Sequence, residues 1–418
     1  MKPNILLLGD DLRTPTGVGN ICKDLVTSTL NDFNWIQIAC KQNHPDNGKI
    51  IDISKSISER YKVEGSFVRL YCSSSYGDEY AVKNIIESEK IDLILHITDP
   101  RYYSWLYSIE NEIRKSIPIC YYHVWDNYPI PIFNEGVYKS CDWIGCISKL
   151  TYNVVSEVLQ NTDKCDYVPH GVDINLFKKL DDDIISGSRK NLLKQNCEFA
   201  FLVNNANMRR KQLPTIIEAF SKMIDDLPTD KKNHVMMMMH TNVIGEGGHD
   251  LIKMCDSLYP KLPVLFSTTK VNPETLNQMY NTFSTTINIA SNEGFGLSTL
   301  ESLATQTPII CNRTGGLSEQ IDDNNTWGIG IEPETRKLSG DKHTPYLYED
   351  FVSASTLAEA MLDMTNKSPT DLSEMGIKGR DYVEKNYNLD NMVTGIRNGI
   401  SNTLGNFKSA PSYRIERI

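Results

Sequence analysis

Short apolar runs alternate with amphipathic stretches along most of the chain. Each apolar run of the first half is followed by a loop and a helical pattern, an order typical of βα units in a parallel sheet. These predicted strands are NILLLG (4–9), WIQIAC (35–40), IDLILHI (91–97), IPICYYHV (117–124) and DWIGCIS (142–148).

A second series of the same kind begins near residue 198. Its predicted strands are EFAFLVNN (198–205), HVMMMMH (234–240), PVLFST (263–268), TTINIA (285–290) and TPIICN (307–312). Helical patterns follow at 356–365, 372–386 and 390–404. Two such series predict two doubly wound α/β domains. Ligands of such sheets bind beyond the carboxyl ends of the strands, so we expect the functional site in the loops that follow strands.

Length and composition fit this division. A chain of 418 residues is long enough for two domains of about 200 residues each. No apolar run reaches the roughly 18 residues of a membrane-spanning helix, and the acidic start MKPNILLLGDD is unlike a secretion signal, so we expect a cytoplasmic protein. The ten cysteines form no CxxC pairs and are expected to be reduced. A net charge of −10 argues against a protein that coats nucleic acid.

Two loops of the first half contain candidate binding residues. Gly17 and Gly19 precede a helix expected near Asn20, where glycine lets the backbone approach an anion; a plain tight turn explains them equally well. Cys22 breaks the dinucleotide-binding spacing GxGxxG. In YYHVWDNYP (121–129), His123 is expected at the mouth of a loop, to bind a sugar hydroxyl or move a proton; the alternative is a histidine packed among aromatic rings.

Two loops of the second half contain charged candidates. Arg209, Arg210 and Lys211 stand between a strand and a helix, whose positive end disfavours cations, so the cluster indicates an anionic ligand rather than a solvated turn. In SNEGFGLSTLESL (291–303), Ser298 and Glu301 have capping-box spacing, which predicts that the helix starts at Ser298. Glu293 lies in the loop before that cap and has no local structural explanation.

The segment EGFGLSTLE, together with TPIICNRTGGLSEQI, resembles the E-x7-E region of family 4 glycosyltransferases. PHGVD (169–173) and RRKQLPTIIEAF resemble further segments of that family. The resemblance implies the GT-B fold, in which two Rossmann-like domains face each other across a cleft. It also implies retaining transfer from a nucleotide-diphosphate sugar, linked to UDP or GDP, with no bound metal or other cofactor.

Domain boundaries follow from the patterns and the resemblance together. We expect an acceptor-side domain at 1–175, a linker at 176–195 and a nucleotide-sugar-binding domain at 196–385. A last helix at 386–405 is expected to cross back to the first domain, and a tail at 406–418 ends the chain.

The resemblance also implies roles for individual residues. Glu293 would hold hydroxyls of the donor sugar, and Glu301 the ribose. Arg210 and Lys211 would neutralise the leaving diphosphate. Backbone amides around Gly296, Leu297 and Ser298 would meet that diphosphate. In the first half, His123 would contact the donor sugar, and Gly17 and Gly19 would let their loop approach the phosphate or the acceptor.

One position departs from the family. Where an arginine usually stands about six residues before the lysine, this chain has Asn205, so Arg209 or Arg210 would supply the missing charge.

The acceptor stays open between a glycan, a lipid-linked sugar and another hydroxyl compound. DDLRTPTGVGN and YYHVWDNYP resemble glycosyltransferase-like proteins of phages, so an enzyme that glycosylates hydroxymethylated cytosine in DNA is one alternative. A nucleotide-sugar epimerase and a non-catalytic sugar-nucleotide-binding protein are two others.

Overall fold

The computed structural model describes residues 2–245, 247–342 and 344–409. The chain forms two compact units. Unit 1 comprises Met1–Trp125, Ile130–Pro169 and the chain from Asp390 onward, and unit 2 comprises Asp126–Pro129 and His170–Leu389. None of the described helices combines the length and the apolar character needed to cross a membrane.

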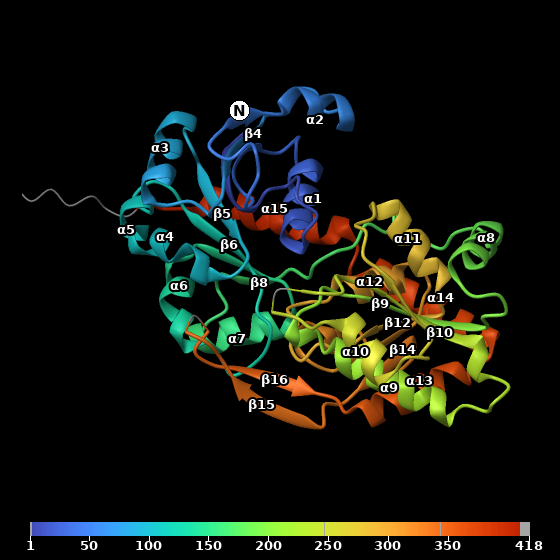
Figure 1. The fold of residues 1–418 in the computed structure, drawn as a ribbon. Helices are drawn as coiled ribbons and strands as arrows, with labels where there is room; N and C mark the ends of the chain where they lie inside the picture. Colours follow the sequence, from blue (N-terminus) through green and yellow to red (C-terminus); the bar gives the residue numbers. More distant parts are fainter. Residues whose placement is uncertain (1, 246, 343, 410–418) are drawn as a thin grey trace, which may run out of the picture. The chain divides into compact units, whose positions relative to one another are not determined.

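Unit 1 is built on an eight-stranded sheet in the order β3-β4-β2-β1-β5-β6-β7-β8 (Figure 1). Its strands pair in parallel except β3, which runs antiparallel to β4. The strands are β1 (Asn4–Asp10), β2 (Asn34–Cys40), β3 (Ile50–Asp52), β4 (Val68–Ser73), β5 (Leu93–Ile97), β6 (Ile119–His123), β7 (Trp143–Cys146) and β8 (Cys165–Tyr167). The α-helices are α1 (Gly17–Ser28), α2 (Ser54–Tyr61), α3 (Glu79–Glu89), α4 (Ser104–Ser108), α5 (Glu110–Ile113), α6 (Glu135–Ser140), α7 (Lys149–Leu159) and α15 (Leu389–Asn406).

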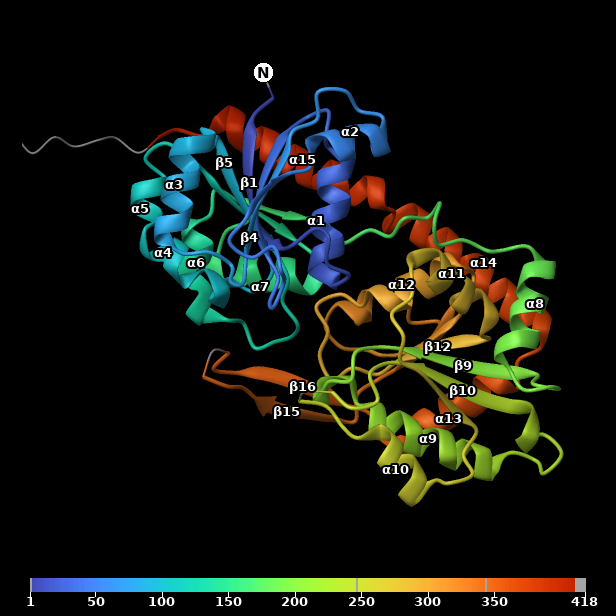
Figure 2. The ribbon, with the colours of Figure 1, turned by 45° about the horizontal axis from the view of Figure 1, so that its top comes forward.

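Unit 2 is built on a parallel sheet in the order β11-β10-β9-β12-β13-β14, and a separate antiparallel hairpin, β15–β16, extends from it (Figure 2). The strands are β9 (Phe199–Asn204), β10 (Val235–His240), β11 (Val264–Ser267), β12 (Thr285–Asn288), β13 (Ile309–Asn312), β14 (Gly328–Ile331), β15 (Thr335–Ser339) and β16 (Leu347–Phe351). The α-helices are α8 (Asp182–Leu192), α9 (Leu213–Asp226), α10 (Leu251–Leu258), α11 (Pro273–Thr282), α12 (Leu297–Ala304), α13 (Ala354–Thr365) and α14 (Pro369–Asn386).

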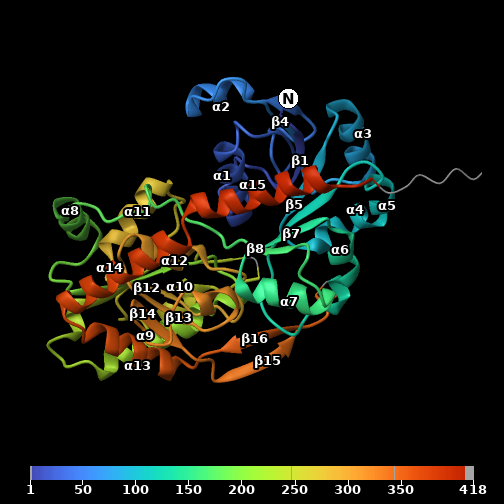
Figure 3. The same ribbon diagram turned by 180° about the vertical axis from the view of Figure 1, so that it is seen from behind.

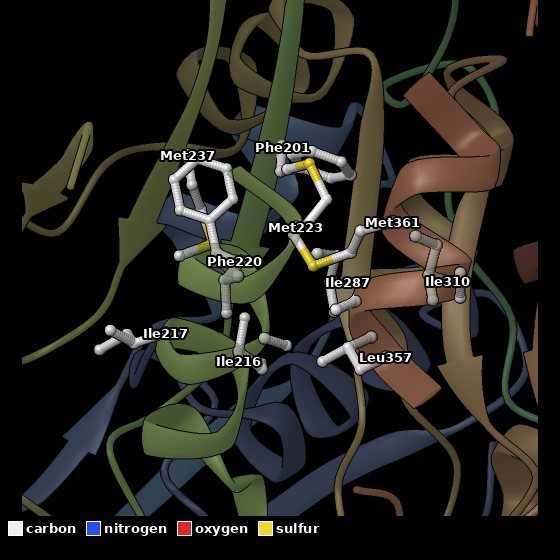
Figure 4. Packing of buried hydrophobic residues seen from close by; sticks show 14 of the residues in the cluster. Phe201, Ile216, Ile217, Phe220, Met223, Met237, Ile287, Ile310, Leu357 and Met361 are labelled. Carbon is white, nitrogen blue, oxygen red and sulfur yellow. The ribbon is translucent and has the colours of Figure 1, made fainter. Parts of the chain in front are cut away.

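The core of unit 2 lies between its sheet and the helices α9, α10 and α13. Phe201 and Ile287 of the sheet pack against Phe220 and Met223 of α9 and Met361 of α13 (Figure 4). The methionine run of β10 is buried in the sheet, as its apolar neighbours predict. Helices α12, α14, α11 and α8 lie on the opposite face of the sheet, where α12 packs against α14 and α11 packs against α8.

The predicted strands are all present, and the predicted C-terminal helices are α13, α14 and α15. Strands β3, β4, β8, β14, β15 and β16 were not expected from the pattern. The segment 176–195 contains α8 and belongs to unit 2, so that unit begins before residue 196. The last helix belongs to unit 1 from Asp390 onward, and most of the expected tail lies outside the described residues.

Helix α15 crosses the strands of unit 1, and its successive turns reach Val168 after β8, Trp143 of β7 and Cys120 of β6 (Figure 3). Its small residues permit this close packing, because a Cβ atom on Gly399 would lie 2.2 Å from Cε2 of Trp143 on β7. A Cβ atom on Gly395 would similarly lie 2.7 Å from Cγ1 of Val168.

Replacing Gly399 with alanine should therefore destabilise the protein. Overpacking of this kind lowers the free energy of unfolding by about 1–3 kcal/mol, which urea denaturation would measure. Gly405 is the matched control in the same helix, since a Cβ there would meet no atom within 4 Å. Equal stability of the Gly399→Ala and Gly405→Ala variants would contradict the packing of α15.

Candidate active site

The parallel sheet of unit 2 brings two charged loops together. Strands β9 and β12 are neighbours, so the loops at their carboxyl ends lie side by side. Arg210 and Lys211 lie in a short 3-10 helix, Arg209–Lys211, after β9, and Glu293 lies between β12 and α12. Two cations of the predicted cluster, Arg210 and Lys211, therefore meet the predicted loop carboxylate in one site.

Glu293 forms ion pairs with both cations. Its Oε2 accepts a hydrogen bond of 3.0 Å from Arg210 and one from Nζ of Lys211. Arg210 also donates to the carbonyl of Asn292 at 2.8 Å. The side chains of Glu293 and Lys211 are only 12% and 9% exposed. Burial would raise the pKa of Glu293, but the charges of Lys211 and Arg210 prevail and lower it to about 2.

Two adjacent glycines, Gly315 and Gly316, pack against the backbone of the Glu293 loop. The N–H of Gly316 donates to the carbonyl of Glu293 at 2.8 Å. A Cβ atom on Gly315 would lie 2.2 Å from that carbonyl oxygen, and one on Gly316 would lie 2.3 Å from the carbonyl of Gly294. The sequence TGG therefore positions the carboxylate, a role that no local pattern indicated.

Helix α12 begins next to Glu293 and has no side-chain cap. Gly296 is its N-cap residue, with a left-handed φ of +98°. Ser298 is the second residue of the helix, so the predicted capping box of Ser298 and Glu301 is wrong. Glycine tolerates the left-handed conformation that starts the helix earlier than expected. The N–H groups of the first turn, at Leu297 and Ser298, are thereby left for an anion.

Glu301 accepts a hydrogen bond from a distant tyrosine. The hydroxyl of Tyr280 on α11 donates to Oε2 of Glu301 at 2.6 Å, and Asn204 donates to the same hydroxyl at 2.7 Å. Burial raises the pKa of Glu301 to about 7, although the tyrosine hydrogen bond opposes the rise. Glu301 therefore exchanges its proton near neutral pH, whereas Glu293 stays ionised.

Arg209 lies apart from its two neighbours. Its side chain is 67% exposed, and its guanidinium donates to the buried Glu349 of β16 at 2.9 Å. Arg210 and Lys211 are thus the cations at Glu293, and Arg209 binds the hairpin.

Three buried polar atoms near these loops have no hydrogen-bond partner among the described residues. They are Nδ2 of Asn205, Oγ1 of Thr241 and Oγ of Ser291, which follow the adjacent strands β9, β10 and β12. Asn205 stands where the family resemblance places an arginine. Buried polar groups are normally paired, so three unpaired ones at one sheet edge indicate a site for a polar ligand.

A second network fastens this edge to the hairpin. Asp350 on β16 is 1% exposed and accepts hydrogen bonds from Asn127 at 2.8 Å, Thr314 at 2.7 Å and Arg336 at 2.6 Å. The N–H of Asp350 donates to the carbonyl of Ser291 at 2.7 Å. The hairpin thereby supports the loop that carries Glu293.

The candidates of unit 1 have structural explanations of their own. His123 is the last residue of β6, within the strand predicted at 117–124, and it is fully buried among aromatic rings. Its Nε2 lies 2.7 Å from the hydroxyl of Tyr138, and burial lowers its pKa to about 3. The alternative, a histidine packed among aromatic rings, is confirmed, and the expected opening to a loop mouth is wrong because the ring is buried against Tyr121 and Tyr138.

The glycine loop of unit 1 starts a helix earlier than predicted. Helix α1 begins at Gly17 instead of near Asn20, and Thr16 caps it by accepting from the N–H of Gly19 at 3.0 Å. A Cβ atom on Gly19 would lie 2.3 Å from the carbonyl of Thr14. Tight packing of the loop against the helix therefore requires this glycine, whatever else the loop binds.

The described residues contain no cluster of three or more His, Cys, Asp or Glu side chains placed to share a metal ion.

One family model matches a segment of unit 2. Residues 187–338 match the family model described as glycosyl transferases group 1. This segment includes Arg209, Arg210, Lys211, Glu293 and Glu301. No curated protein matches the chain by sequence.

Solved structures show the fold of the whole chain. HepE of Anabaena, in complex with UDP and glucose, has a TM-score of 0.69 at 14% identity, over 96% of this chain and 100% of its own. A glycosyltransferase from Rickettsia africae has a TM-score of 0.70 at 15% identity, over 96% and 99%. Sucrose-phosphate synthase from Thermosynechococcus elongatus has a TM-score of 0.70 at 14% identity, over 97% and 100%. The predicted α/β fold of GT-B type, with two Rossmann-like domains, is confirmed.

Proposed function

We propose, from the glycosyltransferase group 1 domain that this chain carries, that the protein is a retaining glycosyltransferase. It moves a sugar from a nucleotide-diphosphate sugar to a hydroxyl acceptor. The observation that carries the proposal is the buried network of Glu293, Arg210 and Lys211 beside the uncapped start of α12. HepE, which shares the fold, is described with bound UDP and glucose, and this supports a UDP-linked donor, with GDP as the alternative nucleotide.

The leaving diphosphate requires positive charge that is already in place. Arg210, Lys211 and the N–H groups at the start of α12 supply it without reorganisation at the moment of reaction. A diphosphate that binds the two cations releases Glu293 from part of its ion pairing. The carboxylate can then accept hydrogen bonds from hydroxyls of the donor sugar. Because these cations neutralise the leaving group, transfer should not require a metal ion.

Retention follows if the acceptor attacks from the face that the diphosphate leaves. A diphosphate oxygen then accepts the acceptor's proton while the bond to the sugar carbon breaks. Glu301, protonated or ionised near neutral pH, would hold the ribose. His123 and the loop of Gly17 and Gly19 are further proposed contacts of the sugar, the phosphate or the acceptor.

Product analysis tests this proposal. The full chain is incubated with UDP- and GDP-sugars and with glycan, lipid-linked and hydroxymethylated-DNA acceptors, with and without EDTA. We expect release of nucleotide diphosphate, a glycosylated product with the anomeric configuration of the donor by NMR, and no loss of rate in EDTA. Inverted product or loss in EDTA would contradict the mechanism. Epimer formation without transfer would instead support a nucleotide-sugar epimerase, and binding without turnover would support a non-catalytic sugar-nucleotide-binding protein.

Replacing Arg210 with glutamine should weaken binding of nucleotide diphosphate. A charge-assisted hydrogen bond contributes about 1.5–3 kcal/mol, so calorimetry should show Kd rising by more than tenfold. Arg209→Gln is the matched control, because Arg209 contacts Glu349 rather than Glu293 and its loss should change Kd by less than about threefold. The reverse ranking would assign the diphosphate to Arg209.

A further inference from the structure

A cavity of unit 2 lies at the amino-terminal edge of its sheet, opposite the edge that carries Glu293. It has a volume of about 440 Å³. The first residues of β9 and β10, Phe199 and Val235, line it together with Ser284 and Pro308, which precede β12 and β13. Helix α8 and the junction of α13 and α14 complete the wall. A ligand in this cavity would be a different molecule from one at Glu293.

Basic side chains are concentrated around this cavity. Lys179, Arg189, Lys231, His234 and Lys367 line it, against one carboxylate, Glu198. This is the opposite of the whole chain, whose net charge is −10. Two of these five basic residues contact acidic partners: His234 lies 2.8 Å from Glu198, and Lys367 lies 3.6 Å from Asp363. Asp182 also acts electrostatically on Lys179.

Three cations of the cavity form no ion pair among the described residues. Arg189 is oriented by backbone carbonyls alone, donating to Thr282 at 2.7 Å, Glu198 at 3.2 Å and Cys197 at 3.3 Å. Its charge is fixed in place but not neutralised. The ammonium groups of Lys179 and Lys231 have neither hydrogen bond nor ion pair within the described chain. An oriented guanidinium and two lysines that line one cavity without forming an ion pair to any described residue are suited to a phosphate group.

The remaining wall is apolar. Ile185, Leu227, Phe283 and Leu372 line the cavity together with Phe199 and Val235. Binding cavities for small molecules combine such a wall with a few placed polar groups, and volumes of about 300–1,000 Å³ are usual. A bare phosphate ion would leave the apolar wall uncovered, whereas an ester adds a carbon skeleton.

We propose that this cavity binds the phosphate monoester of a small metabolite, with its phosphate among Lys179, Arg189 and Lys231 and its carbon skeleton against the apolar wall. The ligand is an effector rather than the sugar donor, because the site lies at the opposite edge of the sheet from Glu293. The proposal does not depend on the reaction that the protein catalyses.

Calorimetric titration of the full chain tests the site. The probes are ribose 5-phosphate, glucose 6-phosphate and 3-phosphoglycerate, each paired with its unphosphorylated parent, and inorganic phosphate alone. We expect at least one ester to bind with one-to-one stoichiometry, more tightly than its parent and than inorganic phosphate. Absence of binding by all three esters at millimolar concentration, or equal binding of ester and inorganic phosphate, would overturn the proposal.

Matched variants locate the bound ester. The double variant Lys179→Ala/Lys231→Ala removes the two unpaired lysines and should raise Kd about tenfold or more. Lys261→Ala/Lys270→Ala removes two lysines of unit 2 that do not line the cavity and form no ion pair with any residue that the structure describes, and it should leave Kd nearly unchanged. Equal weakening by both pairs would indicate only a general charge effect. If Arg210→Gln lost ester binding and Lys179→Ala/Lys231→Ala kept it, the ester would lie at the donor site and the proposal would be wrong.

Discussion

Replacing Glu293 with alanine should both destabilise the protein and stop transfer. The change leaves Lys211, 9% exposed, without its carboxylate partner. Removal of one partner from a buried ion pair costs about 3–5 kcal/mol, so urea denaturation should show a clear fall in the free energy of unfolding. Transfer, measured well below the melting temperature, should fall by about 100-fold or more, because the charges around the donor no longer match.

A double variant separates the two effects of Glu293. In Lys211→Met/Glu293→Leu both charges of that pair are gone, so part of the lost stability should return, since apolar replacement of a buried ion pair is often neutral. Arg210 also loses its carboxylate, but its side chain is 28% exposed and still donates to the carbonyl of Asn292. Transfer should not return, because the carboxylate and the lysine are both absent. An alanine variant that unfolds like the wild type would contradict the ion pairing, and one that turns over normally would contradict the proposed role.

Replacing Glu301 with glutamine should change how stability depends on pH. The pKa of Glu301 in the folded chain is about 7, above the usual 4.5. Its stabilising effect is therefore fully present below about pH 4.5 and is lost as pH rises through 7. The difference between 4.5 and 7 corresponds to about 3–4 kcal/mol, which the partial exposure of Glu301 to solvent reduces. Glutamine does not titrate and should abolish this loss.

The measurement compares both proteins in urea at pH 5 and pH 8. From pH 5 to pH 8, we expect the free energy of unfolding of the glutamine variant to rise relative to that of the wild type. The comparison removes the contribution of other groups, which matters because His123 and His170 have pKa values of about 3 and produce the opposite slope at acidic pH. If the two proteins differed in free energy of unfolding by the same amount at pH 5 and at pH 8, the raised pKa of Glu301 would be contradicted.

The strands of both units could be predicted because parallel, doubly covered strands are continuous apolar runs. The elements that escaped prediction lack that signal. Strand β4, VRLYCS, alternates polar and apolar residues, and β15, TRKLS, is mostly exposed. Yet β15–β16 carries Arg336 and Asp350, which support the Glu293 loop.

The candidate site shows the limit of local patterns. Glu293 had no local partner, and its cations lie 82 and 83 residues away, joined only by the adjacency of β9 and β12. Glu301 matched a capping box by spacing. Its real partner, Tyr280, comes from another helix, and a left-handed glycine displaced the cap. Residue types and loop positions were predictable, but their pairing required the fold.

The placement of α15 has a consequence for biosynthesis. The chain leaves unit 1 after Pro169 and returns to it only at Asp390, so a ribosome makes the rest of unit 2 first. Until then the surface of Trp143 that receives Gly399 has no helix against it. Domains usually fold in the order of their synthesis. Here the unit that emerges first is the one completed last, and a chain stalled or cut before Asp390 would present an unfinished apolar sheet to chaperones and proteases.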